Sequence, residues 1–180
     1  MKVIMLLAML TPGLASAAVT LKNSGGELTF LAVGKPSMLK IKGRAENPEA
    51  HFTVDGASLS GTAEVEMEKF GSGIALRDRH MKERYLETAR FPKSKLTVKN
   101  LNVGINFADT LSVPSQNFEG LLSFHGQEHA VKGSFAGSNG ALTASFTLSL
   151  KEFGVEIPSY LGVTVAENVD VEVSLSLVKE

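Results

Sequence analysis

The sequence predicts an all-β protein, a sandwich or barrel of about eight to ten antiparallel strands interrupted by one short helix. In several segments apolar and polar residues alternate with period two, which sends successive side chains to opposite faces of a sheet. Gly-rich connections separate these segments at short spacing. A single charged segment, residues 73–100, breaks the alternation. Strands with one apolar and one polar face favour antiparallel pairing over buried parallel pairing.

A secretory leader is expected at the start of the chain. Met1 and Lys2 provide a basic start, an apolar run extends from Val3 to Leu10, and Ala15-Ser16-Ala17 forms a small-residue cleavage site. The apolar run is much shorter than the roughly 20 residues of a membrane-spanning helix. We therefore expect residues 1–17 to be a signal peptide and residues 18–180 to form one exported domain.

The lack of cysteine and the nearly neutral charge balance indicate in which compartment the protein works and which partners it does not bind. The chain has no cysteine, so the exported domain depends on packing without disulfides, which suits a Gram-negative periplasm. The chain has 18 Lys and Arg against 19 Asp and Glu, and loss of Lys2 with the leader changes the net charge from −1 to −2. This balance argues against nucleic-acid binding. A periplasmic protein is the expectation.

The first half of the chain contains one clear strand and several weaker ones. In GTAEVEMEKF, residues 61–70, Ala63, Val65 and Met67 share one face, and the intervening glutamates share the other. Weaker alternation predicts further strands at residues 27–33, 38–43 and 50–55.

The segment GIALRDRHMKERYLETARFPKSKLTVKN contains the predicted helix, at about residues 78–89. Asp78 is a favourable N-cap, and its carboxylate suits the positive end of the helix dipole. Met81 and Tyr85 have i,i+4 spacing and share one helix face. Pro92 stops the helix, because the residue before a proline disfavours helical dihedrals. We expect this helix to cap one end of a barrel.

The second half of the chain carries the cleanest alternation. Phe146 and Leu148 lie on one face of the segment 142–150, and Thr147 lies on the other. Residues 168–177 alternate in the same way. Further strands are expected at residues 94–99, 101–107, 117–124 and 130–136.

Three stretches, in order along the chain, resemble a known family. LRDRHMKERYLETARFPKSKLTV resembles the R-D-x-H-M…L…FP signature of YceI-like proteins, the periplasmic polyisoprenoid-binding group. FEGLLSFHGQEHAVKGSF resembles the family's G-x-L-T hairpin, and ASFTLSLKEFGVEIPSYLGVTVAENVDVEVSLSL resembles its closing strands. The resemblance covers roughly residues 37–178. It implies an up-and-down antiparallel lipocalin-like β-barrel around an elongated apolar cavity that holds an isoprenoid tail, such as that of a quinone precursor.

Neither catalytic nor metal-binding residues are predicted. The chain has no cysteine and no G-x-S-x-G motif, and no order of residues suggests a catalytic triad. His125 and His129 flank a predicted turn and could meet across two strands. Two imidazoles are nevertheless fewer than the three or four ligands of a zinc site, so surface or turn histidines are the default interpretation.

A bound lipid is the expected ligand, and no cofactor is expected. The candidate ligand-binding residues are the apolar positions of strands and helix, with His80 added as a polar group: Phe30, Ile41, Phe52, Val65, Met67, His80, Met81, Tyr85, Leu86, Phe124, Phe135, Phe146, Leu148 and Phe153. The same apolar residues could instead fill a solid core. For His80, a buried side chain that pins the helix through a backbone carbonyl is favoured over contact with the ligand's head, because buried polar groups must be satisfied.

The positive charge of residues 77–99 has two interpretations. This stretch holds eight cationic and three acidic side chains, a net charge of +5, whereas residues 151–180 carry a net charge of −4. The side chains either form a solvated face with ordinary ion pairs or direct the barrel mouth to an anionic membrane surface.

The sequence therefore predicts a periplasmic carrier of an amphiphilic, isoprenoid or quinone-like lipid, not an enzyme, in the form of a monomer or homodimer. One alternative is a non-enzymatic adaptor with a solid barrel that docks an exported partner through its basic face. A lipid-modifying enzyme is the less favoured alternative.

Overall fold

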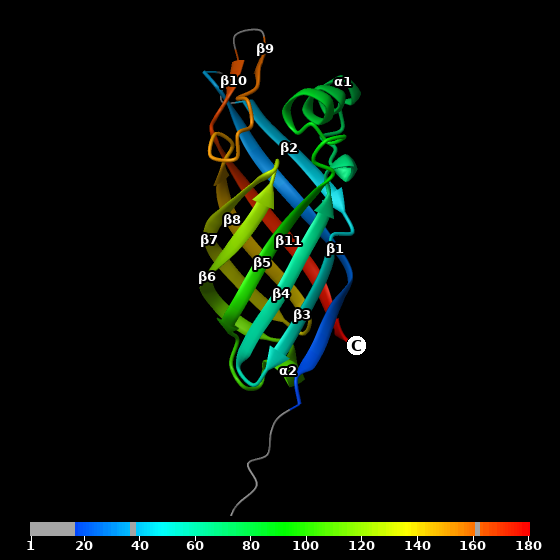
Figure 1. Ribbon diagram of the computed structural model, residues 1–180, viewed down its shortest axis with the longest axis vertical. Coiled ribbons are helices and arrows are strands. Elements are labelled where there is room, and N and C mark those ends of the chain that lie inside the picture. The colour runs from blue at the N-terminus through cyan, green and yellow to red at the C-terminus, as the bar shows by residue number, and fades with distance from the viewer. Residues whose placement is uncertain (1–16, 37–38, 161–162) are drawn as a thin grey trace, which may run out of the picture.

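The computed structural model describes residues 17–36, 39–160 and 163–180 (Figure 1). The predicted signal peptide lies outside the described residues except for Ala17. Among the residues described, no helix is long and apolar enough to cross a membrane.

Eight antiparallel strands form a closed barrel, which confirms the predicted fold class (Figure 1). Strands of the ring that follow one another in the chain pair with each other, with β2 skipped between β1 and β3, and with β9 and β10 skipped between β8 and β11. The last strand, β11, pairs with β1 and closes the ring. The strands are β1 (Val19–Lys35), β3 (Glu49–Asp55), β4 (Ser58–Glu66), β5 (Lys93–Asn102), β6 (Val113–Phe124), β7 (Gln127–Ser138), β8 (Ala141–Ser149) and β11 (Asn168–Lys179).

Three further strands extend the barrel at one end. β2 (Leu39–Glu46) pairs with the second half of β1, while β3 pairs with its first few residues, so that β2 and β3 together occupy one place in the ring. β9 (Ser159–Tyr160) and β10 (Val163–Val165) form a small ladder that pairs with the end of β1.

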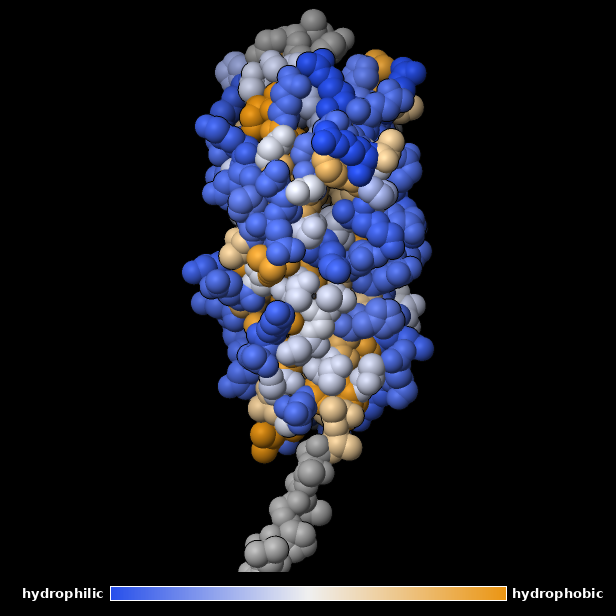
Figure 2. Space-filling view, in the orientation of Figure 1, coloured by the Kyte–Doolittle hydropathy of each residue, from blue (hydrophilic) through white to orange (hydrophobic). Residues whose placement is uncertain are grey.

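Strand register brings apolar side chains of neighbouring strands to the same face. On β8, Phe146 lies opposite Val171 of β11 and Gly133 of β7, and the side chains of Phe146 and Val171 are buried in the interior. Thr147, one residue further along β8, lies opposite Asp170 and is exposed. The outer surface of the barrel is correspondingly rich in hydrophilic side chains (Figure 2).

One end of the barrel is closed by α2 (Phe107–Thr110), where the prediction of a strand over residues 101–107 is wrong beyond Asn102. The Asn102 side chain accepts a hydrogen bond of 3.1 Å from the Gly104 N–H, and Gly104 has a φ of 82°. This local turn, which glycine adopts without steric cost, ends β5. Phe107 is therefore directed into the barrel end, where it is 1 % exposed.

The opposite end carries the predicted helix, with different boundaries. α1 (Ala75–His80) continues directly into a π-helical turn, η2 (Met81–Tyr85), so that the helix begins and ends earlier than residues 78–89. Asp78 is not the N-cap; it lies inside α1, and its side chain reaches back to Ser72. The helix ends before Glu87, which has a φ of 44°. We call residues 72–88 the lid.

Candidate ligand-binding cavity

The barrel encloses a cavity of about 810 Å³. This volume lies within the roughly 300–1,000 Å³ typical of small-molecule sites. Every strand of the ring contributes to the wall, and the lid contributes from one end. Most of the lining side chains are aliphatic or aromatic, which suits an apolar ligand.

The cavity does not extend through the whole barrel. At the α2 end, Leu21, Val54 and Phe107 are each at most 1 % exposed, and none of them lines the cavity. Val103 and Leu177 are also buried there without lining it. The interior therefore combines a filled core at the α2 end with a cavity toward the lid, so neither a fully hollow nor a fully solid barrel describes it.

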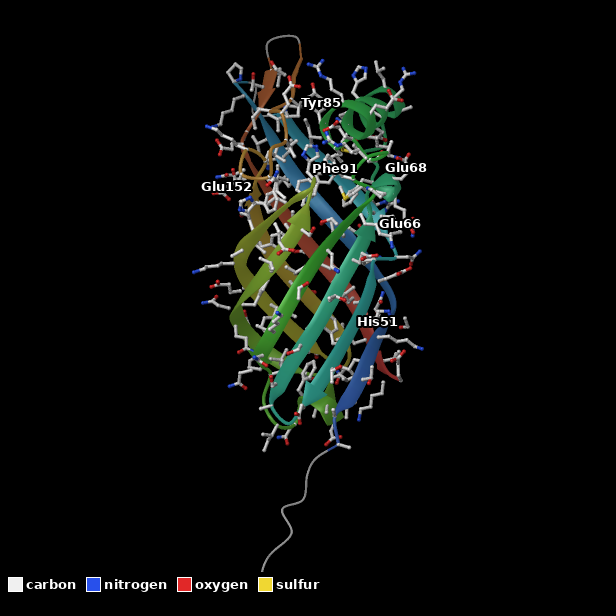
Figure 3. The ribbon with its side chains drawn as sticks, in the orientation of Figure 1. His51, Glu66, Glu68, Tyr85, Phe91 and Glu152 are labelled. Carbon is white, nitrogen blue, oxygen red and sulfur yellow. The ribbon has the colours of Figure 1, made fainter. Side chains whose placement is uncertain are left out.

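Most polar residues that line the cavity lie near the lid. Arg77, His80, Arg84 and Tyr85 come from α1 and η2, and Ser159 comes from β9. Glu64 of β4 and Ser94 of β5 also line the cavity. Tyr85 lies on the lid at the end of the barrel, well away from His51 in the other half (Figure 3). The cavity is thus apolar in its depth and polar at its rim, which suits an amphiphilic molecule.

One end of the lid is held by Glu68 of η1 (Met67–Lys69). Its carboxylate accepts hydrogen bonds from the buried Thr88 hydroxyl at 2.8 Å and from Lys82 Nζ at 3.1 Å. The hydrogen bond from Thr88, followed by the hydrogen bond and charge of Lys82, lowers the pKa of Glu68. Thr88 and Lys82 both belong to the lid, so this acid ties the lid to the end of β4.

Within the lid, Asp78 ties the start of the helix back to Ser72. Its carboxylate accepts hydrogen bonds from the Ser72 N–H at 2.8 Å and from the Ser72 hydroxyl. Arg77 donates to the Ser72 hydroxyl at 2.7 Å and to the Ser72 carbonyl at 2.9 Å. Partial burial raises the pKa of Asp78, but the hydrogen bonds from Ser72 and Gly73, with the charge of Arg77, outweigh it and lower the pKa overall.

The structure places thirteen of the fourteen candidate residues on the cavity wall: Phe30, Ile41, Phe52, Val65, Met67, His80, Met81, Tyr85, Leu86, Phe124, Phe135, Phe146 and Leu148. Met67 lies in η1 and not in a strand, yet its side chain still faces inward. Phe153 is buried outside the cavity lining, in edge-on contact with Phe124 and His129 at ring distances of 5.5 and 5.0 Å.

Other lining residues were not among the candidates. Phe118, Val171 and Val173 line the cavity, and each follows the alternation of its predicted strand. Phe70 also lines the cavity, and its ring lies 5.9 Å from that of Phe30. Phe70 follows a helical turn, so no periodicity in the sequence indicates its direction.

The histidines differ from their predicted surroundings. His80 is exposed at the cavity rim, so the prediction of a buried histidine is wrong. His125 does lie in a turn, but its side chain is only 9 % exposed. Within the described ranges, no group of three His, Cys, Asp or Glu side chains is arranged to hold a metal ion.

Comparisons with known proteins agree with this architecture. A family model described as YceI-like domain matches residues 20–177. No curated protein matches the chain.

Solved structures share the fold at low sequence identity. A polyisoprenoid binding domain from Saccharophagus degradans, implicated in plant cell wall breakdown, is 12% identical with a TM-score of 0.65, and the match covers 90% of this chain and 99% of that one. Burkholderia cenocepacia BcnA is 15% identical with a TM-score of 0.64, and the match covers 85% and 96% of the two chains. A mutant YceI protein of Campylobacter jejuni with a monobromobimane guest is 13% identical with a TM-score of 0.55, covering 78% and 85%.

Proposed function

This chain belongs to the YceI-like family, and from that premise we propose that it binds and carries an amphiphilic lipid with an isoprenoid-like tail. The observation that supports the proposal most is the polarity of the cavity, which is apolar inside and has cationic and hydroxyl groups at the lid. One solved relative with the same fold is described as a polyisoprenoid binding domain. The proposed role is binding and transport, with no catalytic step.

The size of the cavity bears on the length of the tail. If each methylene-sized group takes about the volume of one water molecule, roughly 30 Å³, the cavity of about 810 Å³ holds on the order of 25 such groups. A tail of several isoprene units fits this space, whereas a short-chain metabolite would leave much of it empty.

We also propose that the protein works in the periplasm after removal of residues 1–17. The basic start, the apolar run and the Ala15-Ser16-Ala17 site support this proposal. A periplasmic carrier would move a membrane-derived lipid through water, which requires a cavity that covers the apolar tail.

Native mass spectrometry of the protein from its own host tests both proposals. The expected result is an intact mass that starts at Ala18, with an added mass from one extractable long-chain lipid. A species that retains Met1 would contradict export. Absence of a lipid, together with failure of the lipid-free protein to bind an added long-chain isoprenoid, would contradict the carrier function.

A matched pair of variants links the lipid to the cavity. Ala144 is half-buried and lines the cavity, and the adjacent Thr143 is exposed. Ala144→Phe fills cavity space without adding a polar group, so we expect the bound lipid to be lost while the barrel stays folded. Thr143→Phe adds the same ring outside and should retain the lipid. Equal retention by both variants would place the lipid elsewhere.

A further inference from the structure

We infer that the lid end of the barrel is a docking surface for an anionic lipid bilayer, which the protein meets with the open side of its cavity. This inference concerns the outer surface of the lid end. It does not require the cavity to be filled.

The first observation is a group of exposed apolar side chains. Leu39, Ile74 and Leu76 are 48 %, 53 % and 51 % exposed, and all three also line the cavity rim. The other large apolar side chains exposed in the described residues, among them Ile105 and Leu121, belong to other parts of the barrel. Apolar side chains gathered on an exposed surface mark an interaction site. Here the surface is continuous with the apolar cavity.

The second observation is the charge around these apolar side chains. The lid end comprises residues 33–36, 39–40, 72–88, 155–160 and 163–166, and it carries six cationic and four acidic side chains, a net charge of +2. The cationic residues are Lys35, Lys40, Arg77, Arg79, Lys82 and Arg84, and the acidic residues are Asp78, Glu83, Glu87 and Glu156. The whole chain has a net charge of −1, so the positive charge is concentrated at this end.

Several of these cations remain available to an outside partner. Lys40 and Arg79 are exposed and form no ion pair with any residue in the described part of the chain. Arg84 pairs with Glu156 at 3.2 Å, but both side chains are 64% exposed, so solvent screens this pair. A surface bearing both apolar and cationic groups matches the interface of an anionic bilayer, where acyl chains lie beneath phosphate groups.

The third observation is the orientation of the lid helix, α1 and η2, relative to the barrel. None of the residues of α1 or η2 is fully buried. Met81 and Tyr85 pack against the core, while Ile74 and Leu76 remain exposed at the start of the helix. This segment therefore contacts the barrel with one side and offers apolar and cationic side chains with another, as a helix lying at a membrane surface does.

A single introduced tryptophan tests the docking directly, because the chain has none. Leu76→Trp places the reporter on the proposed surface, and Ile105→Trp places it on a residue that is 78% exposed, beside α2 at the opposite end. With vesicles that contain phosphatidylglycerol, fluorescence of the Leu76→Trp variant should shift to the blue and be quenched by brominated acyl chains. The Ile105→Trp variant should show neither effect. Equal responses at both positions, or none at position 76, would overturn the inference.

Charge variants and solution controls complete the experiment. Arg79→Gln with Lys40→Gln should weaken vesicle binding on the order of 30-fold, or about fivefold for each cation. Lys99→Gln with Lys132→Gln, on the outer faces of β5 and β7, should change binding much less. Equal binding to purely zwitterionic vesicles would refute the anionic partner. A blue shift that grows with protein concentration without vesicles would assign the surface to a second copy of the chain and overturn the inference.

Discussion

Phe146 and the residues around it on β8 alternate between the cavity and the solvent. Phe146 is buried and lines the cavity, whereas Thr147 is exposed and donates a hydrogen bond of 2.7 Å to Asp170 Oδ1. The alternation in the sequence predicts both directions, because side chains of a strand have period two. It does not indicate that Thr147 has an acidic partner on β11. This contact makes position 147 unsuitable for a charge test, since an added carboxylate would lie beside Asp170.

Phe146→Asp should empty the cavity of lipid, and Thr143→Asp should not. An unpaired carboxylate inside the barrel costs several kcal/mol or takes up a proton, but the adjoining cavity allows the side chain and some water to be accommodated. We expect a lower melting temperature and loss of bound lipid, measured by thermal denaturation and native mass spectrometry. Thr143 is exposed on the same strand, so its variant should resemble the parent. Similar losses at both positions would contradict the assignment of faces.

His125 shows what local sequence does not reveal about a side chain. Its Nδ1 lies 3.2 Å from the Phe153 carbonyl oxygen, and its ring lies 4.5 Å from that of Phe91. Its Nε2 lies 3.1 Å from Glu87 Oε2 but without the alignment of a hydrogen bond. Two segments far apart in sequence, residues 87–91 and Phe153, thus surround one turn residue. The sequence predicts a turn next to His125, whereas the burial results from the packing of these two segments.

At the scale of elements, the lid combines polar contacts with apolar packing of Met81, Tyr85 and Leu86 against the core. Asp78 braces its beginning by accepting hydrogen bonds from Ser72, and Glu68 holds its end through Thr88 and Lys82. The sequence predicts that a helix forms in this segment. Asp78 is a favourable N-cap residue by type, but it lies inside α1 and its carboxylate accepts from Ser72, so the capping rule placed the start of the helix too late.

Acid should loosen the lid before it unfolds the barrel. The pKa values of Asp78 and Glu68 are both lowered in the folded protein, so each carboxylate favours the folded lid above its unfolded pKa. This contribution is lost as the pH falls through the lower, folded value, which for these acids means below about pH 4. Amide chemical shifts of Ser72 and residues 75–85, followed by NMR between neutral and acidic pH, should change before those of the strands.

Asp78→Asn provides the control for this titration. The amide can still accept a hydrogen bond but carries no charge, so the lid should be less protected at neutral pH and the acid-dependent change at Ser72 should disappear. If the Ser72 amide shifts with pH equally in the parent and the variant, Asp78 is not the anchor.

At the scale of the whole molecule, the pairing of β1 with β11 closes the barrel. Gly26 lies at this junction opposite Leu175, and a Cβ built on it would come within 2.5 Å of the Ser174 carbonyl oxygen. The preceding Gly25 follows an irregularity in the register, and a Cβ there would meet nothing within 4 Å. A methyl group would therefore clash with the backbone of β11 at position 26 but would meet no other atoms at position 25.

Gly26→Ala should destabilise the barrel by about 1–3 kcal/mol, because backbone atoms of β11 must move to admit the methyl group. Gly25→Ala should be neutral or slightly stabilising, since it reduces the freedom of the unfolded chain. Urea denaturation measures both free energies of unfolding. Equal effects of the two substitutions would show that the junction does not close as described.

By itself, the sequence determined the class of fold and the direction of most side chains. Alternation in residues 61–66, 142–150 and 168–177 depends on the two-residue repeat of a strand, which is a local property, and the same repeat brought most candidate residues to the cavity wall. The family resemblance predicted the closed barrel. Whether the interior was hollow or filled could not be predicted from these patterns.

Only the tertiary structure decided which part of the interior is a cavity. Phe107 fills the α2 end because β5 stops at Asn102 and the chain turns inward, whereas Phe153 leaves the cavity because it packs against Phe124 and His129. Phenylalanine thus fills the α2 end at position 107, lines the cavity at position 146 and packs outside the cavity lining at position 153. Space inside a barrel depends on how strands and loops remote in sequence meet, and short-range periodicity carries no information about those distances.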